Sequence, residues 1–161
     1  MIFPCREFMP VIRSALARGQ RVRMTVNGHS MAPFIHDGDL VEIEPIRALP
    51  RRGDVVLLRC SEERYVVHRV MRMEGDAIFL CGDAQRHCEG PFTQRDVLGR
   101  VTLSQRNGHT RAHDRGAWRL AGLAWTSCGP LGRWLLWLAA GVRARGKRLL
   151  RQLRQALFFR A

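Results

Sequence analysis

Residues 53–83 read GDVVLLRCSEERYVVHRVMRMEGDAIFLCGD. Three runs of mostly β-branched or aliphatic residues lie in this stretch, at 55–59, 65–71 and 77–80, and Gly-Asp pairs bound them. Glycine adopts backbone angles that other residues avoid, and aspartate bonds to nearby backbone, so such pairs mark turns. The stretch therefore predicts three short strands joined by turns.

The same pattern continues on both sides of this stretch. Apolar residues alternate with polar ones at 22–26 and again at 41–44, and another aliphatic run follows at 97–103. A period of two residues is typical of strands with one buried face. We expect residues 20–105 to form a mainly β domain of about six strands.

Near the start of the chain, apolar residues follow a helical spacing instead. Phe8, Val11, Ile12 and Leu16 are spaced i, i+3, i+4 and i+8, which places them on one side of a helix. Residues 1–19 are therefore predicted to form a short N-terminal amphipathic helix.

The composition changes after the predicted β-domain. All four tryptophans lie within residues 118–137, and residues 111–161 hold 11 basic residues and one acidic residue, against 16 and 13 in residues 1–110. An apolar stripe at helical spacing predicts amphipathic helices within residues 106–161. Indole rings and arginines together suit an anionic membrane surface, which we favour as the partner of residues 117–161. The alternative is a helix that packs its stripe on the β-domain and leaves its arginines in water.

Cysteine usage and hydropathy argue against a metal site and against a membrane-spanning helix. The five cysteines are odd in number and form neither a C-x-x-C pair nor a zinc-ligand spacing, so we expect reduced thiols and no metal or other cofactor. The longest apolar run, Trp134–Val142, has nine residues, about half of the roughly 18 that argue for a spanning helix. The first residues lack the pattern of a signal peptide. We expect a peripheral or interfacial membrane protein, and a chain ending near Gln105 should keep the β-domain.

Residues 26–39, VNGHSMAPFIHDGD, contain the candidate nucleophile. They place Ser30 between a strand and a proline-bounded turn, with Gly28 two positions before it. A serine in a tight loop can project its hydroxyl while backbone N–H groups beside it bind an oxyanion, and acyl transfer needs both. The candidate donors are the backbone N–H of Ser30 and the loop at Gly28. Taken alone, the segment fits an ordinary turn serine better.

Several short boxes follow one another along residues 22–103. They are Ser30-Met-x-Pro33 with Gly38-Asp39, Arg52-Gly-Asp-Val-Val56, Tyr65-Val-Val-His-Arg-Val70, Gly75-Asp76, Gly82-Asp83 and Asp96-Val-Leu-Gly-Arg-Val101. Their order resembles that of the signal peptidase I family. The resemblance implies a mostly antiparallel β-fold and a serine endopeptidase that cleaves an exported precursor polypeptide after small residues, at a bacterial inner membrane.

One branch of that family has a histidine in place of the lysine base, and the resemblance gives this role to His68. The lysine count agrees, because the single lysine of the chain is Lys147, in the basic tail. Arginine keeps its proton and cannot act as the base. A histidine with an ordinary pKa of about 6.5 is largely neutral at pH 7 and can accept the serine proton. Taken alone, His68 fits a half-buried strand histidine.

The resemblance also implies an acidic residue that orients the imidazole, in or shortly after the last Gly-Asp box. Asp83 and Glu89 are both candidates, and Asp83 is favoured slightly. Met31, Pro33 and Phe34 are expected to shape an apolar, substrate-binding mouth beside the nucleophile. All five also have ordinary structural interpretations, as turn, loop or core-facing residues.

The other histidines are not expected to take part. His29 neighbours Ser30, but adjacent side chains in an extended segment point to opposite faces. Four more are predicted to lie in solvated loops: His36, His87, His109 and His113.

Two alternatives remain. The Ser-Met-x-Pro box is also similar to that of LexA-type self-cleaving repressors, which require a lysine base, a DNA-binding module and a cleavable Ala-Gly or Cys-Gly bond before the serine; residues 1–29 contain no such bond. The other alternative is a non-enzymatic module, built on a degenerate peptidase fold, whose basic tail binds membrane or nucleic acid. No specific nucleic acid is expected, because the β-domain shows no base-stacking motif.

Overall fold

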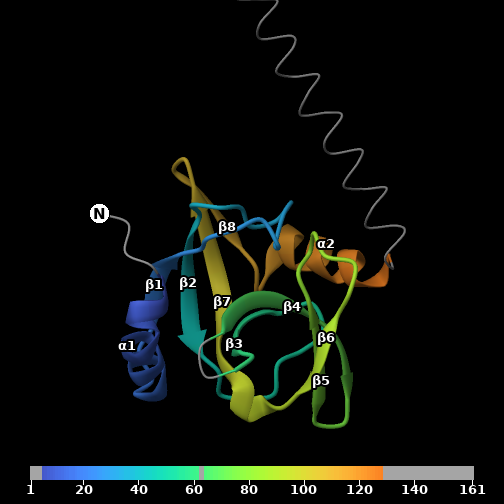
Figure 1. Ribbon diagram of the computed structural model, residues 1–161. Coiled ribbons are helices and arrows are strands. Elements are labelled where there is room, and N and C mark those ends of the chain that lie inside the picture. Colours follow the sequence, from blue (N-terminus) through green and yellow to red (C-terminus); the bar gives the residue numbers. More distant parts are fainter. Residues whose placement is uncertain (1–4, 62–63, 129–161) are drawn as a thin grey trace, which may run out of the picture.

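The structure is a computed structural model that describes residues 5–61 and 64–128. Figure 1 shows its helices and strands. In chain order these are α1 (Cys5–Ala17), β1 (Val22–Thr25), β2 (Leu40–Pro45), β3 (Val55–Arg59), β4 (Tyr65–Glu74), β5 (Ala77–Cys81), β6 (Glu89–Phe92), the 3-10 turn η1 (Gln94–Asp96), β7 (Val97–Arg106), β8 (His109–Ala112) and α2 (Gly116–Ser127).

All the described strands belong to one antiparallel sheet. Its order is β1-β2-β7-β3-β4-β5-β6, and β8 pairs with β7. The predicted mainly β fold with a short N-terminal helix is confirmed, and a strand lies at each of the six predicted places. The alternation and the Gly-Asp turns were therefore reliable guides to the strands.

Two strands, β6 and β8, were not predicted. β6 reads Glu-Gly-Pro-Phe and contains the residues least suited to a strand interior, and β8 reads His-Thr-Arg-Ala, without an apolar face. Both lie at sheet margins, β6 against β5 and β8 against β7. Their positions depend on a neighbouring strand rather than on their own residue pattern.

The middle strand β3 is buried on both faces. Val55 and Leu57 belong to one apolar cluster, under α1 and the loop that follows β1, while Val56 and Leu58 belong to a second cluster, with β5. Four consecutive buried apolar residues are what a strand with two covered faces requires. Packing on both faces thereby fixes β3, and with it the paired strands β4 and β7.

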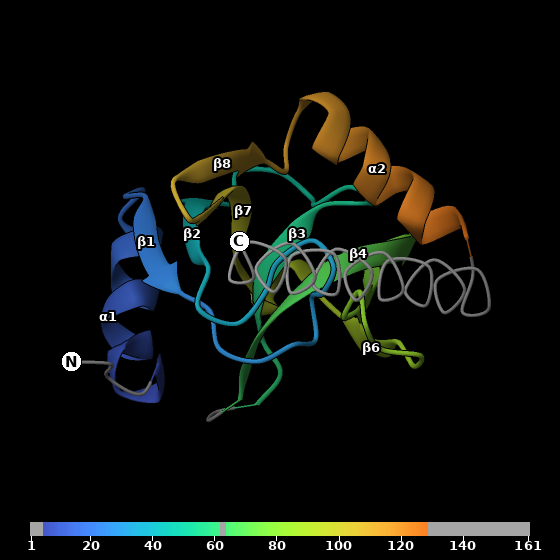
Figure 2. The same ribbon diagram turned by 90° about the horizontal axis from the view of Figure 1, so that it is seen from above.

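The two helices lie at opposite ends of the sheet (Figure 2). In α1 the buried residues are Met9, Ile12 and Leu16, whereas Phe8 and Val11 are exposed. The predicted helix is confirmed, but the apolar face predicted from residues 8 and 11 was wrong, because the helix turns Met9 toward the sheet. Met9 thereby reaches the cavity described below.

The Gly-Asp turns bury most of their aspartates. Three of these carboxylates bind an arginine that lies far away in the sequence: Asp39 binds Arg106, Asp54 binds Arg119 and Asp83 binds Arg69. A buried carboxylate needs such a partner, because an isolated charge in the interior is strongly unfavourable. The turns therefore also connect distant elements.

The sheet continues past residue 105, the predicted end of the β-domain. β7 runs to Arg106, β8 pairs back onto it, and α2 then packs against the sheet with Trp125 only 6% exposed in the core. A chain ending near Gln105 would lack β8, α2 and the buried Trp125, so it would lose part of this core. One side of α2 packs on the sheet, as the packing alternative expects, while Leu120 stays exposed. The predicted helices beyond Cys128 lie outside the described residues.

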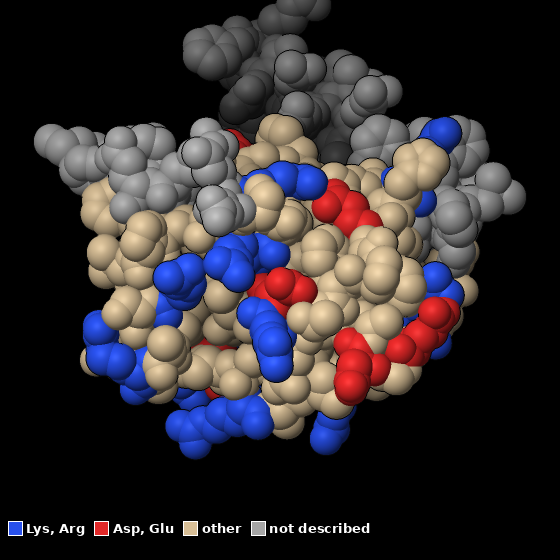
Figure 3. Space-filling view, turned by 60° about the horizontal axis from the view of Figure 1, so that its bottom comes forward, with Lys and Arg blue, Asp and Glu red and all other residues tan. Residues whose placement is uncertain are grey.

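Basic and acidic side chains are interspersed on the face shown in Figure 3. Many of the described arginines have an acidic partner; Arg23 binds Glu42, and Arg100 binds Glu44. This pairing agrees with the near balance of charge in residues 1–110.

Candidate active site

The loop that carries Ser30 is a series of tight turns between β1 and β2. Gly28 has a φ of +96°, which side chains rarely tolerate, and its N–H donates a 2.8 Å hydrogen bond to Asp37 Oδ1. Beyond Ser30 the N–H groups of Phe34 and Ile35 both donate to the carbonyl of Met31 at 3.0 Å. These bonds hold the loop folded around Ser30.

A second loop supports Ser30 from behind. The N–H of Ala84 donates a 2.8 Å hydrogen bond to the carbonyl of Ser30, and a Cβ at Gly82 would lie 2.6 Å from the same oxygen. Glycine at position 82 therefore allows the loop between β5 and β6 to approach the backbone of Ser30 closely. The last Gly-Asp box thus contacts the Ser30 loop directly.

His68 lies on β4, opposite Val56 of β3. It is 3% exposed, and its Nδ1 has no hydrogen-bond partner among the described residues. Burial lowers the pKa of His68 below its ordinary value, while the charge of Glu89 raises it and that of Arg64 lowers it. The imidazole is therefore neutral at pH 7, the state that a general base needs.

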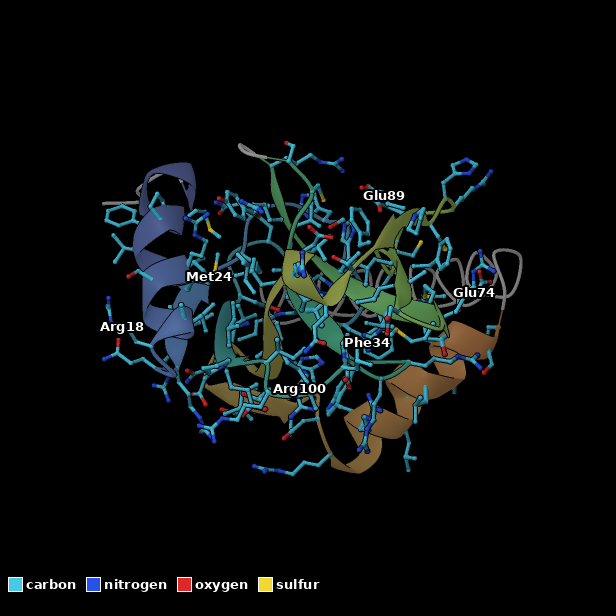
Figure 4. The ribbon with its side chains drawn as sticks, turned by 90° about the horizontal axis from the view of Figure 1, so that it is seen from below. Arg18, Met24, Phe34, Glu74, Glu89 and Arg100 are labelled. Carbon is cyan, nitrogen blue, oxygen red and sulfur yellow. The ribbon has the colours of Figure 1, made fainter. Side chains whose placement is uncertain are left out.

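Ser30 and His68 line the same cavity, of about 410 Å³. Its apolar wall comes from α1, β1, the Ser30 loop, β3 and β4: Met9, Met24, Val26, Met31, Ile35, Leu57, Tyr65, Val66 and Val67. Figure 4 shows Met24 between α1 and the rest of the sheet. An apolar mouth beside Ser30 was predicted from Met31, Pro33 and Phe34, and of these three Met31 lines the cavity. The walls from α1, β3 and β4 were not predicted. Among the described residues, no hydrogen bond joins Ser30 to His68.

The strand edge beside this cavity is open. β5 pairs with β4 from Arg69 onward, so residues 65–68 are paired on one side, with β3. No described strand covers their other edge. Backbone groups along that edge can therefore pair with an added extended segment.

Both carboxylate oxygens of Asp83 bind Arg69, the residue after His68. Arg69 Nε and Nη2 donate to Asp83 Oδ1 and Oδ2 at 2.7 Å each, and Arg69 Nη1 donates to the carbonyl of Gly53 at 2.9 Å. The pair is buried, and the Arg69 guanidinium lies 4.6 Å from the centre of the Phe34 ring. Asp83 therefore links the strand of His68 to the loop behind Ser30. Sequence reasoning missed Arg69, although it lies within the same box as His68.

Glu89 is the acid whose charge acts on His68. It lies at the start of β6, and its carboxylate accepts a 2.7 Å hydrogen bond from Arg64 and a weaker one from the thiol of Cys60. Figure 4 shows Glu89 at the β6 side of the molecule. Arg64 itself belongs to the cavity wall, so the Glu89–Arg64 pair lies at the rim of the candidate site.

The remaining predicted site residues do not all line the cavity. Met31 and Gly28 line the cavity, whereas Phe34 turns into the core and meets Trp118 and Trp125 edge-on. Pro33 is partly exposed. The N–H of Gly28 already donates to Asp37, which leaves the N–H of Ser30 as the donor with no acceptor among the described residues.

A second serine–histidine pair lies elsewhere in the molecule. Ser104 Oγ and His113 Nε2 are 2.8 Å apart, and the two residues are 1% and 2% exposed. Burial, with the charges of Arg69 and Arg111, lowers the pKa of His113 to about 4. The prediction that His113 is solvated was wrong, because its loop lies against the sheet.

The part of the chain that the structure describes contains no group of three His, Cys, Asp or Glu side chains placed to hold a metal ion. None of its helices is both long and apolar enough to cross a membrane.

Comparison with known proteins identifies a family. No curated protein matches the chain. The model of the family described as Peptidase S24-like matches residues 4–102, a region that includes Ser30, His68 and the cavity. This match lies in the superfamily shared by LexA-type and signal peptidase-like proteins, so the resemblance is confirmed at that level and not for signal peptidase I itself. Because the match covers more than half of its 161 residues, the chain belongs to the Peptidase S24-like family.

Proposed function

We propose that the protein is a serine endopeptidase of the signal peptidase type, with Ser30 as nucleophile and His68 as general base. Family membership supports a serine peptidase in general. One observation carries the assignment of residues: Ser30 and His68, from distant parts of the chain, line one cavity beside an open strand edge. The neutral state of the buried imidazole also suits the role.

The substrate is an extended segment of a precursor polypeptide. The free edge at residues 65–68 offers backbone donors and acceptors to such a segment, which would add to the sheet as a strand. Alternate side chains of that segment would enter the cavity, whose wall of Met24, Met31 and Leu57 favours apolar side chains over charged ones.

The reaction follows from the positions of the groups. Ser30 Oγ attacks the scissile carbonyl carbon and passes its proton to His68, and the N–H of Ser30 donates to the resulting oxyanion. His68 then gives that proton to the departing amine as the peptide bond breaks. Water then attacks the acyl carbon and gives a proton to His68, which passes it to Ser30 Oγ as the ester bond breaks and the acid product leaves. Catalytic hydrogen bonds often tighten when substrate is bound, so the open Ser30–His68 geometry is compatible with this role.

Glu89 is the better candidate for the acid that assists His68. Its charge raises the pKa of His68, and protonation of the imidazole during the reaction would be favoured by a nearby carboxylate. Asp83, slightly favoured from the sequence, instead has both oxygens on Arg69. We assign Asp83 the task of holding the loop behind Ser30.

We further propose that residues 117–161 hold the protein on an anionic membrane surface, such as a bacterial inner membrane. Within the described part of this segment, Leu120 is 67% exposed and Trp118 37% exposed on α2. The basic excess of residues 111–161 would add about 1 kcal/mol for each basic residue near the surface. Sedimentation with anionic vesicles, reduced by salt and by neutral lipid, tests this; equal retention by DNA would contradict it.

Covalent labelling tests the catalytic proposal most directly. A serine-directed acylating probe is incubated with the protein, and the modified residue is mapped by mass spectrometry. We expect one adduct on Ser30, lost in Ser30→Ala and strongly slowed in His68→Ala.

Matched variants serve as controls. Ser14→Ala changes an exposed serine on α1, and His29→Ala changes the exposed neighbour of Ser30. Both should label and cleave like the parent. Equal labelling of Ser30→Ala and the parent would refute the assignment.

A further inference from the structure

Helix α2 lies outside the residues that match the family model, yet it packs on the candidate site. The match ends at residue 102, and α2 begins at Gly116. Trp118 and Trp125 meet the Phe34 ring edge-on, with centroids 5.7 and 5.4 Å away. Phe34 belongs to the Ser30 loop, so α2 covers the inner side of that loop; Figure 4 labels this ring.

Trp125 makes a second contact, which Trp118 lacks among the described residues. Its Nε1–H donates a 3.3 Å hydrogen bond to the carbonyl of Asp83. The next residue, Ala84, donates its N–H to the carbonyl of Ser30 at 2.8 Å. One short chain of hydrogen bonds therefore runs from the α2 indole through the Asp83 loop to the nucleophile.

Helix α2 also contacts β4, the strand that carries His68. Any Cβ at Gly122 would collide with Arg69 Nη1, so the helix backbone approaches the guanidinium as closely as glycine allows. Arg69 follows His68 in β4 and binds Asp83. α2 therefore contacts the supports of both candidate catalytic residues.

We propose that α2 is a brace for the active site and that Trp125 is its positioning residue, acting on Ser30 through the Asp83 loop. The inference rests on the proposed function of Ser30 and His68. Trp125 touches neither the cavity nor the substrate, so its effect should be on the rate of acylation rather than on binding. A small displacement of a reacting atom is sufficient to slow an enzyme substantially.

The test compares two substitutions that keep an aromatic ring. Trp125→Phe retains the contact with Phe34 and removes the indole N–H, whereas Trp118→Phe makes the same change where no described hydrogen bond depends on it. We expect Trp125→Phe to lower kcat at least about tenfold with KM nearly unchanged. Trp118→Phe should stay within about twofold of the parent.

A second control separates positioning from loss of stability. Ile78→Val removes one buried methyl group in the other apolar cluster and is expected to lower the melting temperature. If Ile78→Val at a matched melting temperature slows kcat as much as Trp125→Phe, Trp125 is a structural residue and the proposal is overturned. Gly122→Ala, which crowds Arg69, should reproduce the loss in kcat.

A readout without catalysis keeps the inference apart from the proposed function. Amide hydrogen exchange at Ala84 reports the bond to the Ser30 carbonyl. Exchange should be faster in Trp125→Phe than in the parent and unchanged in Trp118→Phe. A parent without peptidase activity would refute the function, while equal exchange at Ala84 in all three proteins would refute the brace.

Discussion

Two serine–histidine pairs of the described chain, Ser104–His113 and Ser30–His68, differ in hydrogen bonding and in access to a cavity. Ser104 and His113 are hydrogen-bonded at 2.8 Å and almost wholly buried. Ser30 and His68 have no hydrogen bond between them among the described residues, yet both line a cavity of about 410 Å³. Ser104 and His113, the closed pair, have the hydrogen bond of a catalytic dyad but no access for a substrate. Ser30 and His68, the open pair, can be reached from the cavity but are not hydrogen-bonded to each other.

The difference shows that surroundings decide what such a pair can do. Burial beside Arg69 and Arg111 lowers the pKa of His113 to about 4, and this histidine serves as a fixed neutral partner for Ser104. His68 is also buried, but the cavity and the open edge of β4 adjoin it. Hydrogen-bond distance alone would therefore select Ser104 and His113 rather than the pair proposed to be catalytic.

The largest expected effect tests whether chemistry belongs to the open pair. Ser30→Ala and His68→Ala should each lower kcat by about 10⁴-fold, and the double variant should be scarcely slower, because the two residues act as a unit. Hydrolysis of a peptide with small residues at the scissile bond measures this. Ser104→Ala should retain kcat for each folded molecule; if it loses activity as fully as Ser30→Ala, the comparison is reversed.

A chain truncated after Gln105 would lose His113 of the closed pair and keep both residues of the open pair. A chain ending at Gln105 lacks His113 and Trp125, and loss of the Trp125 ring from the core should alone cost about 4 kcal/mol. We expect no cooperative unfolding transition in urea for this chain. A chain ending at Cys128 should unfold cooperatively, and a stable 1–105 chain would show that α2 is dispensable for the fold.

Lowering the pH should reduce the free energy of unfolding because His113 of the closed pair is buried in its neutral form. The folded pKa of His113, about 4, lies below the ordinary value of 6.5, so the unfolded chain binds the proton more readily. The stability from this residue is present above about pH 6.5, and up to about 3 kcal/mol is lost as the pH falls toward 4. Urea unfolding at pH 7 and pH 4.5 should show a smaller difference for His113→Gln. Ser104→Ala, which leaves His113 titratable, should keep most of the difference.

The smallest expected effect concerns the charges around the open pair. The rate should rise with pH through the pKa of His68, with a midpoint below 6.5, because burial lowers that pKa. Glu89→Gln removes a charge that raises the pKa and should move the midpoint to lower pH. Arg64→Gln should move it to higher pH, each by less than about one unit. Profiles of kcat/KM against pH decide this, and shifts in the same direction for both variants would contradict the assignment of Glu89.

Local patterns predicted much of the fold and both residues of the open pair. The strands at 22–26 and 41–44 followed from alternation, the strand at 97–103 from an aliphatic run, and the choice of Ser30 and His68 from the family resemblance of the ordered boxes. What failed depends on contacts between distant residues. His113 appeared solvated because nothing near it in the sequence shows that its loop meets Ser104, and Asp83 appeared to be a partner of His68 because its bond to Arg69 is a tertiary contact.

The position of α2 in the chain has a thermodynamic consequence. The helix ends at Ser127, directly before the basic residues 129–161, and its Trp125 is bonded to the loop behind Ser30. Any ligand of that basic segment which favours one placement of α2 is linked to the order of the site. Linkage is reciprocal, so a substrate held in the cavity must change the affinity for that ligand by the same factor.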